Sequence, residues 1–174
     1  WVEDSKRKPG LEDIAGADPK AIAREHERYQ TILDRLPLAI ETQLPDGRRI
    51  GIVHAGLRCP YRWADVQAIF RRDANLDHPR AALQPLLLWD RLPANSAFAS
   101  SYPDVVARLA ALNLEHRLYQ EIEDIDLLIS GHCQTPLLQP MRSGMRLFLD
   151  TGAGFADGLL SMVEISSGRC WQVP

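Results

Sequence analysis

Short apolar runs that end abruptly in small or polar residues recur along the chain, and this pattern is typical of buried strands in a sheet. The run Arg49 to Val53 ends at His54, and the run Ile125 to Ile129 leads into Gly131-His132. Side chains at the carboxyl end of a sheet strand commonly face a ligand crevice. We therefore expect His54 and His132 to be held at neighbouring strand ends.

The remaining pattern alternates strands with helices and predicts an α/β layered domain, with a mixed sheet inside and helices outside. Further strands are expected over residues 38–44, 147–149, 159–165 and 170–173, and helices over residues 19–36, 63–72 and 102–123. Residues 45–47 and 142–144 are typical of turns between strands. Pro85 argues against a long straight helix in the apolar segment that starts at His78. Residues 1–18 lack periodicity and are expected to form a surface loop.

The composition fits one domain of ordinary size in a reducing compartment. The chain has 174 residues and a formal net charge of -3, which gives no reason to expect nucleic acid or an acidic membrane surface as a partner. The sequence shows no apolar run long enough to cross a bilayer and no signal-peptide pattern. Cys59, Cys133 and Cys170 are too scattered for a disulfide framework or a Cys-x-x-Cys zinc site, so we expect a cytoplasmic protein.

The two strand-end histidines are candidate metal ligands, because neutral imidazole binds first-row metal ions well. For His132 the alternative is a histidine whose hydrogen bond is satisfied by a backbone carbonyl near the core. Arg91 follows the apolar run Leu86 to Trp89, which should anchor it by burying Trp89, and its guanidinium fork suits a phosphate group. The alternative for Arg91 is an ordinary surface arginine.

Four sequence motifs occur in one order and at compatible spacings. They are Gly51-Ile52-Val53-His54-Ala55, Leu88-Trp89-Asp90-Arg91, Ile129-Ser130-Gly131-His132 and Leu149-Asp150-Thr151-Gly152-Ala153. From about Ile32 onward the chain resembles the C-terminal half of the calcineurin-like metallophosphoesterases. Within them it is most similar to the bacterial and lambda-phage-type serine/threonine phosphatases, and then to symmetric dinucleoside tetraphosphatases. The resemblance implies the C-terminal half of an α/β/β/α sandwich with a mixed sheet.

The resemblance also implies roles for individual residues. His54 matches the family's His-Ala ligand and His132 the histidine of its Gly-His-Thr motif, and in that family both bind one ion of a two-metal centre. Nitrogen and oxygen ligands suit two divalent ions such as manganese, iron or zinc. Arg91 matches the arginine of the Trp-x-Arg motif, which holds the substrate phosphate, and Asp150 begins a strand-loop close to the site. Cys133 departs from the usual threonine and is expected to lie buried behind the site.

Three motifs of the family are not found in this sequence: Gly-Asp-x-His-Gly, Gly-Asp-x-x-Asp-Arg-Gly and Gly-Asn-His-Glu. In the family they supply the other metal ligands, including the bridging aspartate, and the general acid. We therefore interpret residues 1–174 as a single partial metallophosphoesterase domain that carries half a site. Its open sheet flank is expected to be covered by the missing N-terminal half or by another chain. The intact protein would be a metal-dependent phosphatase for a phosphorylated protein or a small phosphoester.

Two alternatives from other classes stay open. A degenerate phosphatase fold without catalysis would bind a phosphorylated partner or another protein, and the missing motifs favour this reading. A hydrolase with Cys133 as nucleophile would need a histidine placed to act as its base, and the sequence positions none.

Overall fold

The computed structural model describes residues 19–33, 35–58, 60–70, 77–98 and 122–174. The chain divides into two compact units, residues 1–37 and residues 38–174. The loop predicted over residues 1–18, and all but the end of the helix predicted over residues 102–123, lie outside the described residues. Among the described helices, none combines the length and apolarity that crossing a membrane requires.

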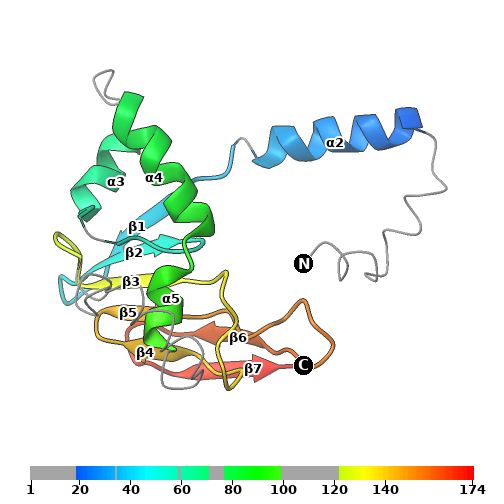
Figure 1. Ribbon diagram of the computed structural model, residues 1–174. Coiled ribbons are helices and arrows are strands. Elements are labelled where there is room, and N and C mark those ends of the chain that lie inside the picture. The colour runs from blue at the N-terminus through cyan, green and yellow to red at the C-terminus, as the bar shows by residue number, and fades with distance from the viewer. Residues whose placement is uncertain (1–18, 34, 59, 71–76, 99–121) are drawn as a thin grey trace, which may run out of the picture. The chain divides into compact units, whose positions relative to one another are not determined.

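Helix α2 (Pro19–Leu33) belongs to the first unit (Figure 1). It begins at the predicted proline, whose missing N–H costs nothing in the first turn of a helix. It ends before Leu36, which was predicted as its last residue. Tyr29, Leu33 and Leu36 of the predicted apolar stripe are exposed.

A mixed five-stranded sheet forms the centre of the second unit (Figure 1). In spatial order its strands are β1 (Ala39–Gln43), β2 (Arg49–Val53), β3 (Leu127–Ser130), β5 (Arg146–Phe148) and β4 (Met141–Ser143). Strands β2, β3 and β5 are parallel, whereas β1 and β4 pair antiparallel at the two edges. The prediction of an α/β fold with a mixed sheet is confirmed.

The β1–β2 hairpin forms where the sequence predicts it. Gly47 has a φ of 91°, a left-handed conformation that glycine adopts without the steric cost of a Cβ. Its backbone N–H donates to the carbonyl of Leu44 at 2.9 Å and closes the turn. The turn sets the register in which Ala39 faces Val53, so β2 ends directly before His54.

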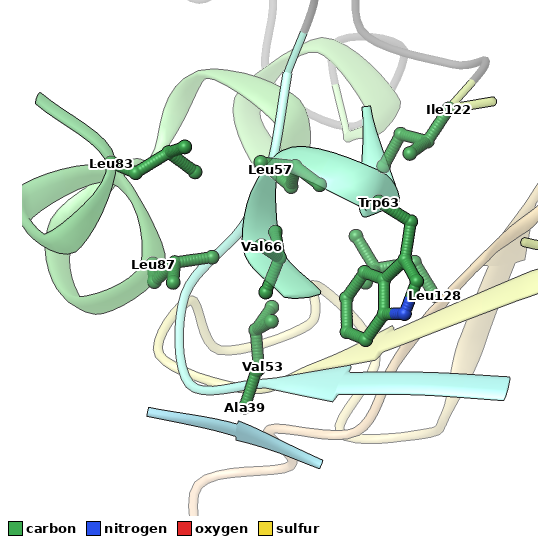
Figure 2. Packing of buried hydrophobic residues seen from close by; sticks show 9 residues of the cluster. All are labelled: Ala39, Val53, Leu57, Trp63, Val66, Leu83, Leu87, Ile122 and Leu128. Atoms are coloured by element: carbon green, nitrogen blue, oxygen red, sulfur yellow. The ribbon is translucent and has the colours of Figure 1, made fainter. Parts of the chain in front are cut away.

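Helices α3 (Trp63–Phe70) and α4 (Asp77–Trp89) cover one face of the sheet. Figure 2 shows their buried side chains pointing toward those of the strands beneath them. The buried cluster consists of Ala39, Val53, Leu57, Trp63, Val66, Leu83, Leu87, Ile122 and Leu128. This packing fixes the end of β2 and the C-terminal end of α4, and both contribute to the site described below.

Pro85 argues against a long straight helix in the sequence, but it lies inside the 13-residue helix α4, which continues past it. Its side chain is exposed, so water can satisfy the carbonyl that loses its helical N–H partner. Leu83 and Leu87 are fully buried on the other side of the helix and hold it against the sheet. Tertiary packing here outweighs the local cost of the proline.

A two-stranded antiparallel sheet, β6 (Leu160–Val163) and β7 (Cys170–Val173), follows the five-stranded sheet in the chain. Both strands were predicted, although the prediction for the first, residues 159–165, is longer than β6 itself. On the face of the large sheet opposite α3 and α4, Ile50, Leu127 and Ile129 form a second buried cluster, against which Ile165 packs. The second unit therefore has apolar layers on both faces of its central sheet.

Candidate metal centre

The parallel pairing of β2 and β3 brings His54 and His132 to the same edge of the sheet. Val53 is the register partner of Ser130, so the two strands end side by side. The backbone N–H of Gly131 donates to the carbonyl of His54 at 2.9 Å and extends this pairing past the strands. The predicted neighbouring strand ends are therefore present.

The imidazoles themselves face each other. His54 Nε2 lies 3.0 Å from His132 Nδ1, and the ring centroids are 4.9 Å apart. His132 has a φ of 63°, the left-handed conformation that non-glycine residues adopt uncommonly. Such strained residues cluster at active sites and ligand clamps, where the surrounding structure maintains them.

The surroundings of His132 favour its neutral form. Burial lowers the pKa of His132 below its usual value, and the nearby charges of His54 and Arg91 lower it further. The carboxylate of Asp150 acts in the opposite direction. Neutral imidazole is the form that binds metal ions, so at neutral pH His132 is in the state that a ligand requires.

The polar atoms of the pair fit part of a metal centre. His132 Nε2 is buried and has no hydrogen-bond partner, so a backbone carbonyl does not satisfy this ring as the alternative reading required. His54 Nε2 and His132 Nδ1 share a hydrogen bond at 3.0 Å, and an ion bound by both nitrogens would replace that hydrogen bond. The described residues contain no group of three or more histidine, cysteine, aspartate or glutamate side chains that could hold a metal. Within that part of the chain, the donor set is therefore two imidazoles.

Arg91 lies between the end of α4 and the short helix α5 (Leu92–Ala97). Its side chain is exposed, and its positive charge lowers the pKa of both His132 and Cys133. The structure thus brings the third predicted site residue within electrostatic reach of the histidine pair. A cation at this place suits an anionic ligand beside the imidazoles.

Trp89 corrects the prediction of how Arg91 is anchored. The side chain is 64% exposed, whereas we expected it in the core. Leu83 and Leu87 of α4, and Asp90 directly after it, are buried at helical spacing, which places Trp89 on the outer side. Its ring centroid is 5.5 Å from that of His132 at an interplanar angle of 89°, so Trp89 borders the site.

The residue that anchors the α4–α5 junction is Asp90, which sequence reasoning did not identify. Asp90 is 8% exposed, and burial raises the pKa of its carboxyl group against the opposing effects of the Leu92 hydrogen bond and the charges of Arg58 and Arg146. Its Oδ1 accepts from the backbone N–H of Leu92 at 3.1 Å, and its Oδ2 lies 3.2 Å from Arg58 Nε. Arg58 follows His54 in the chain, so this ion pair joins two parts of the site.

Cys133 is unsuited to nucleophilic chemistry. Burial raises the pKa of its thiol to about 11, so the thiol is protonated at neutral pH. Its side chain packs against the buried cluster of Ala94, Phe98 and Phe148. Cys133 was expected to be buried, but it is only half-buried, and its protonated thiol disfavours a cysteine hydrolase.

A hollow of about 510 Å³ lies on the other face of the large sheet. Arg48, Arg142 and apolar side chains such as Leu127 and Ile165 line it, and its lining includes no histidine or carboxylate. The histidine pair does not contribute to this hollow. We therefore place the candidate site at the strand ends, where the titratable side chains converge.

The sequence was compared with models of known protein families and with curated proteins. No family model and no curated protein matches it. What bears on function is therefore the geometry of His54, His132 and Arg91, together with the ordered motifs of the sequence.

Proposed function

We propose that His54 and His132 bind one divalent ion in a phosphoester-hydrolysing centre of the metallophosphoesterase type. The observation that carries this proposal is the 3.0 Å approach of His54 Nε2 to His132 Nδ1 at the ends of adjacent parallel strands. The positions of both histidines in the family-like motifs add to it. The substrate class is a phosphorylated protein or a small phosphoester.

Each residue of the site has a distinct task in this proposal. The imidazoles of His54 and His132 hold the ion, whose identity is manganese, iron or zinc by ligand chemistry. When bound, such an ion supplies Lewis acidity to water and to the phosphoryl group. Arg91 binds the phosphate oxygens and stabilises the negative charge that spreads over them during the in-line displacement. Asp150 contributes negative potential near His132.

Two imidazoles hold a metal ion poorly by themselves, and two-metal hydrolysis requires carboxylate ligands. We propose that these further ligands come from outside the described residues and that the segment bearing them covers an edge of the sheet. Within the described part of the chain, the outer edges of β1 and β4 are unpaired. An unpaired strand edge is a template for such an addition. We also propose that the intact protein has the α/β/β/α sandwich architecture of the family.

The second candidate is a domain that binds a phosphorylated partner without hydrolysing it. The three motifs that supply the family's other metal ligands are not found in this sequence, and this favours the second candidate. Both candidates use Arg91 for phosphate, and they differ in whether turnover occurs.

The proposal is tested by assaying the full-length gene product for hydrolysis of a small aryl phosphate. We expect turnover with manganese that a chelator abolishes and that re-added metal restores. Binding of inorganic phosphate without turnover, under the same conditions, would support the non-catalytic alternative.

Replacing Arg91 with alanine is expected to lower kcat/KM by at least about tenfold while metal content stays the same. Charged hydrogen bonds contribute about 1.5–3 kcal/mol each, and about 1.4 kcal/mol corresponds to tenfold in rate. Arg91→Lys should retain more of the parental kcat/KM than Arg91→Ala but not all of it, because an ammonium group does not reproduce the bidentate fork of the guanidinium. Steady-state kinetics with metal analysis of each variant checks this. An alanine variant with the parental rate, or one that loses its metal, would show that Arg91 has another role.

A further inference from the structure

Asp90 precedes Arg91 at the α4–α5 junction and contacts the loop that follows His54. Its Oδ1 accepts a hydrogen bond from the backbone N–H of Leu92 at 3.1 Å. This bond spans Arg91 as an Asx turn, so it restricts the backbone on both sides of the arginine. Arg91 in turn accepts the first backbone hydrogen bond of α5, from Asn95 at 2.8 Å.

The second carboxylate oxygen of Asp90 reaches the loop after β2. Asp90 Oδ2 lies 3.2 Å from Arg58 Nε, and the Asp90 side chain is only 4% exposed against 30% for Arg58. The contact is an ion pair without hydrogen-bond geometry, since Oδ2 has no hydrogen-bond partner. A charge that is this well buried interacts with its partner through a lower dielectric constant than a surface pair does.

Other contacts hold the same loop in place. The N–H of Ala55 donates to the carbonyl of Leu87 in α4 at 2.7 Å. The buried guanidinium of Arg146 donates to the carbonyl of Leu57 at 2.6 Å. At Gly56 a Cβ would lie 3.2 Å from Pro93, so α5 packs closely on the loop. The loop after His54 and the α4–α5 junction therefore form one packed unit, with Asp90 at its centre.

We propose that Asp90 is a positioning residue that acts through Arg91. Its pairing with Arg58 and its bond to Leu92 set the place of the Arg91 guanidinium relative to His54 and His132. This inference rests on the proposed role of Arg91 in phosphate binding. Small misplacements of positioning groups lower rates strongly, so the effect should appear in kcat/KM and in phosphate affinity.

A double-mutant cycle between Asp90 and Arg91 tests the proposal in the metal-loaded full-length gene product. Asp90→Asn retains an acceptor for Leu92 and removes the charge that faces Arg58. We expect it to lower kcat/KM by about tenfold with metal affinity unchanged. In the Arg91→Ala background the same change should have less than about a twofold effect, because residues that act through one another are not additive.

Asp46→Asn is the matched control, since Asp46 pairs with Arg48 at 2.8 Å on the exposed hairpin turn. It should leave kcat/KM unchanged. Arg58→Gln removes the other partner of the buried pair and should reproduce the effect of Asp90→Asn. An equal loss in both backgrounds of Arg91, or no loss in either, would overturn the positioning role.

The affinity for inorganic phosphate is also measured for the variants of the double-mutant cycle, because this measurement requires no turnover. If the protein binds phosphate through Arg91 but hydrolyses nothing, the proposed function fails, while non-additive phosphate affinities still support Asp90 as a positioning residue. If hydrolysis occurs and the Asp90 and Arg91 effects are additive, the proposed function holds and the inference about Asp90 is wrong. If phosphate does not bind at all, both are wrong.

Discussion

Replacing His132 with asparagine is expected to lower metal-dependent hydrolysis by the full-length gene product more than about a hundredfold. Loss even of the groups that support a metal ligand costs about 10–100-fold in affinity or activity, so loss of a ligand should cost more. Asparagine is chosen because His132 has a φ of 63°, which asparagine tolerates better than alanine does. The backbone at the end of β3 should therefore be preserved while the imidazole is removed.

His54→Ala should have an effect of similar size, because both rings are proposed to bind the same ion. The double variant should be scarcely worse than either single variant, since residues that act as a unit are not additive. His26→Ala is the matched control, because His26 lies on α2 with an exposed side chain. Rates and metal content are measured together. Parental activity in the His132 variant would end the assignment of a metal centre here.

Replacing Trp63 with alanine is expected to destabilise the protein by about 4 kcal/mol, within the range found for buried Trp or Phe to Ala changes. Trp63 is fully buried, and its Nε1 donates to Glu41 Oε2 at 2.7 Å. A Cβ at Gly51 would lie 2.6 Å from its ring, so the glycine makes room for the indole. The truncation leaves a cavity beneath α3 and removes the hydrogen-bond donor to Glu41.

Trp89→Ala is the matched control for stability, because this tryptophan is 64% exposed. Its change in the free energy of unfolding should stay within about 0.5 kcal/mol, as for most surface substitutions. Urea unfolding of the three proteins measures both values. A Trp63 variant as stable as the Trp89 variant would contradict the packing described for the first core.

The local sequence pattern was enough to predict the strands and the proximity of His54 and His132, and the physical reason is the parallel pairing of β2 and β3. A parallel pair of strands ends at one edge, so a polar residue after each apolar run reaches the same place. Gly47 of the hairpin turn could also be predicted from the local sequence, because closing the turn requires only the left-handed backbone conformation that glycine adopts easily. The register of β2 with β3 then follows from burying Ile50 beside Leu127.

The errors and omissions arose where distant parts of the chain decide the outcome. Pro85 is accommodated because Leu83 and Leu87 bury the opposite side of α4. Asp90 pairs with Arg58, which lies 32 positions earlier in the chain, and no local pattern reveals such a contact. The left-handed conformation of His132 is likewise a product of the surrounding structure.

The central claim is that His54 and His132 bind the same metal ion, through His54 Nε2 and His132 Nδ1. The most direct test is nitrogen NMR of the 174-residue chain, labelled with ¹⁵N in its histidine rings, during titration with zinc. We predict that these two nitrogens shift together and at lower zinc concentration than those of the exposed His26. Shifts at only one of the two rings, or shifts no stronger than those of His26, would contradict the claim.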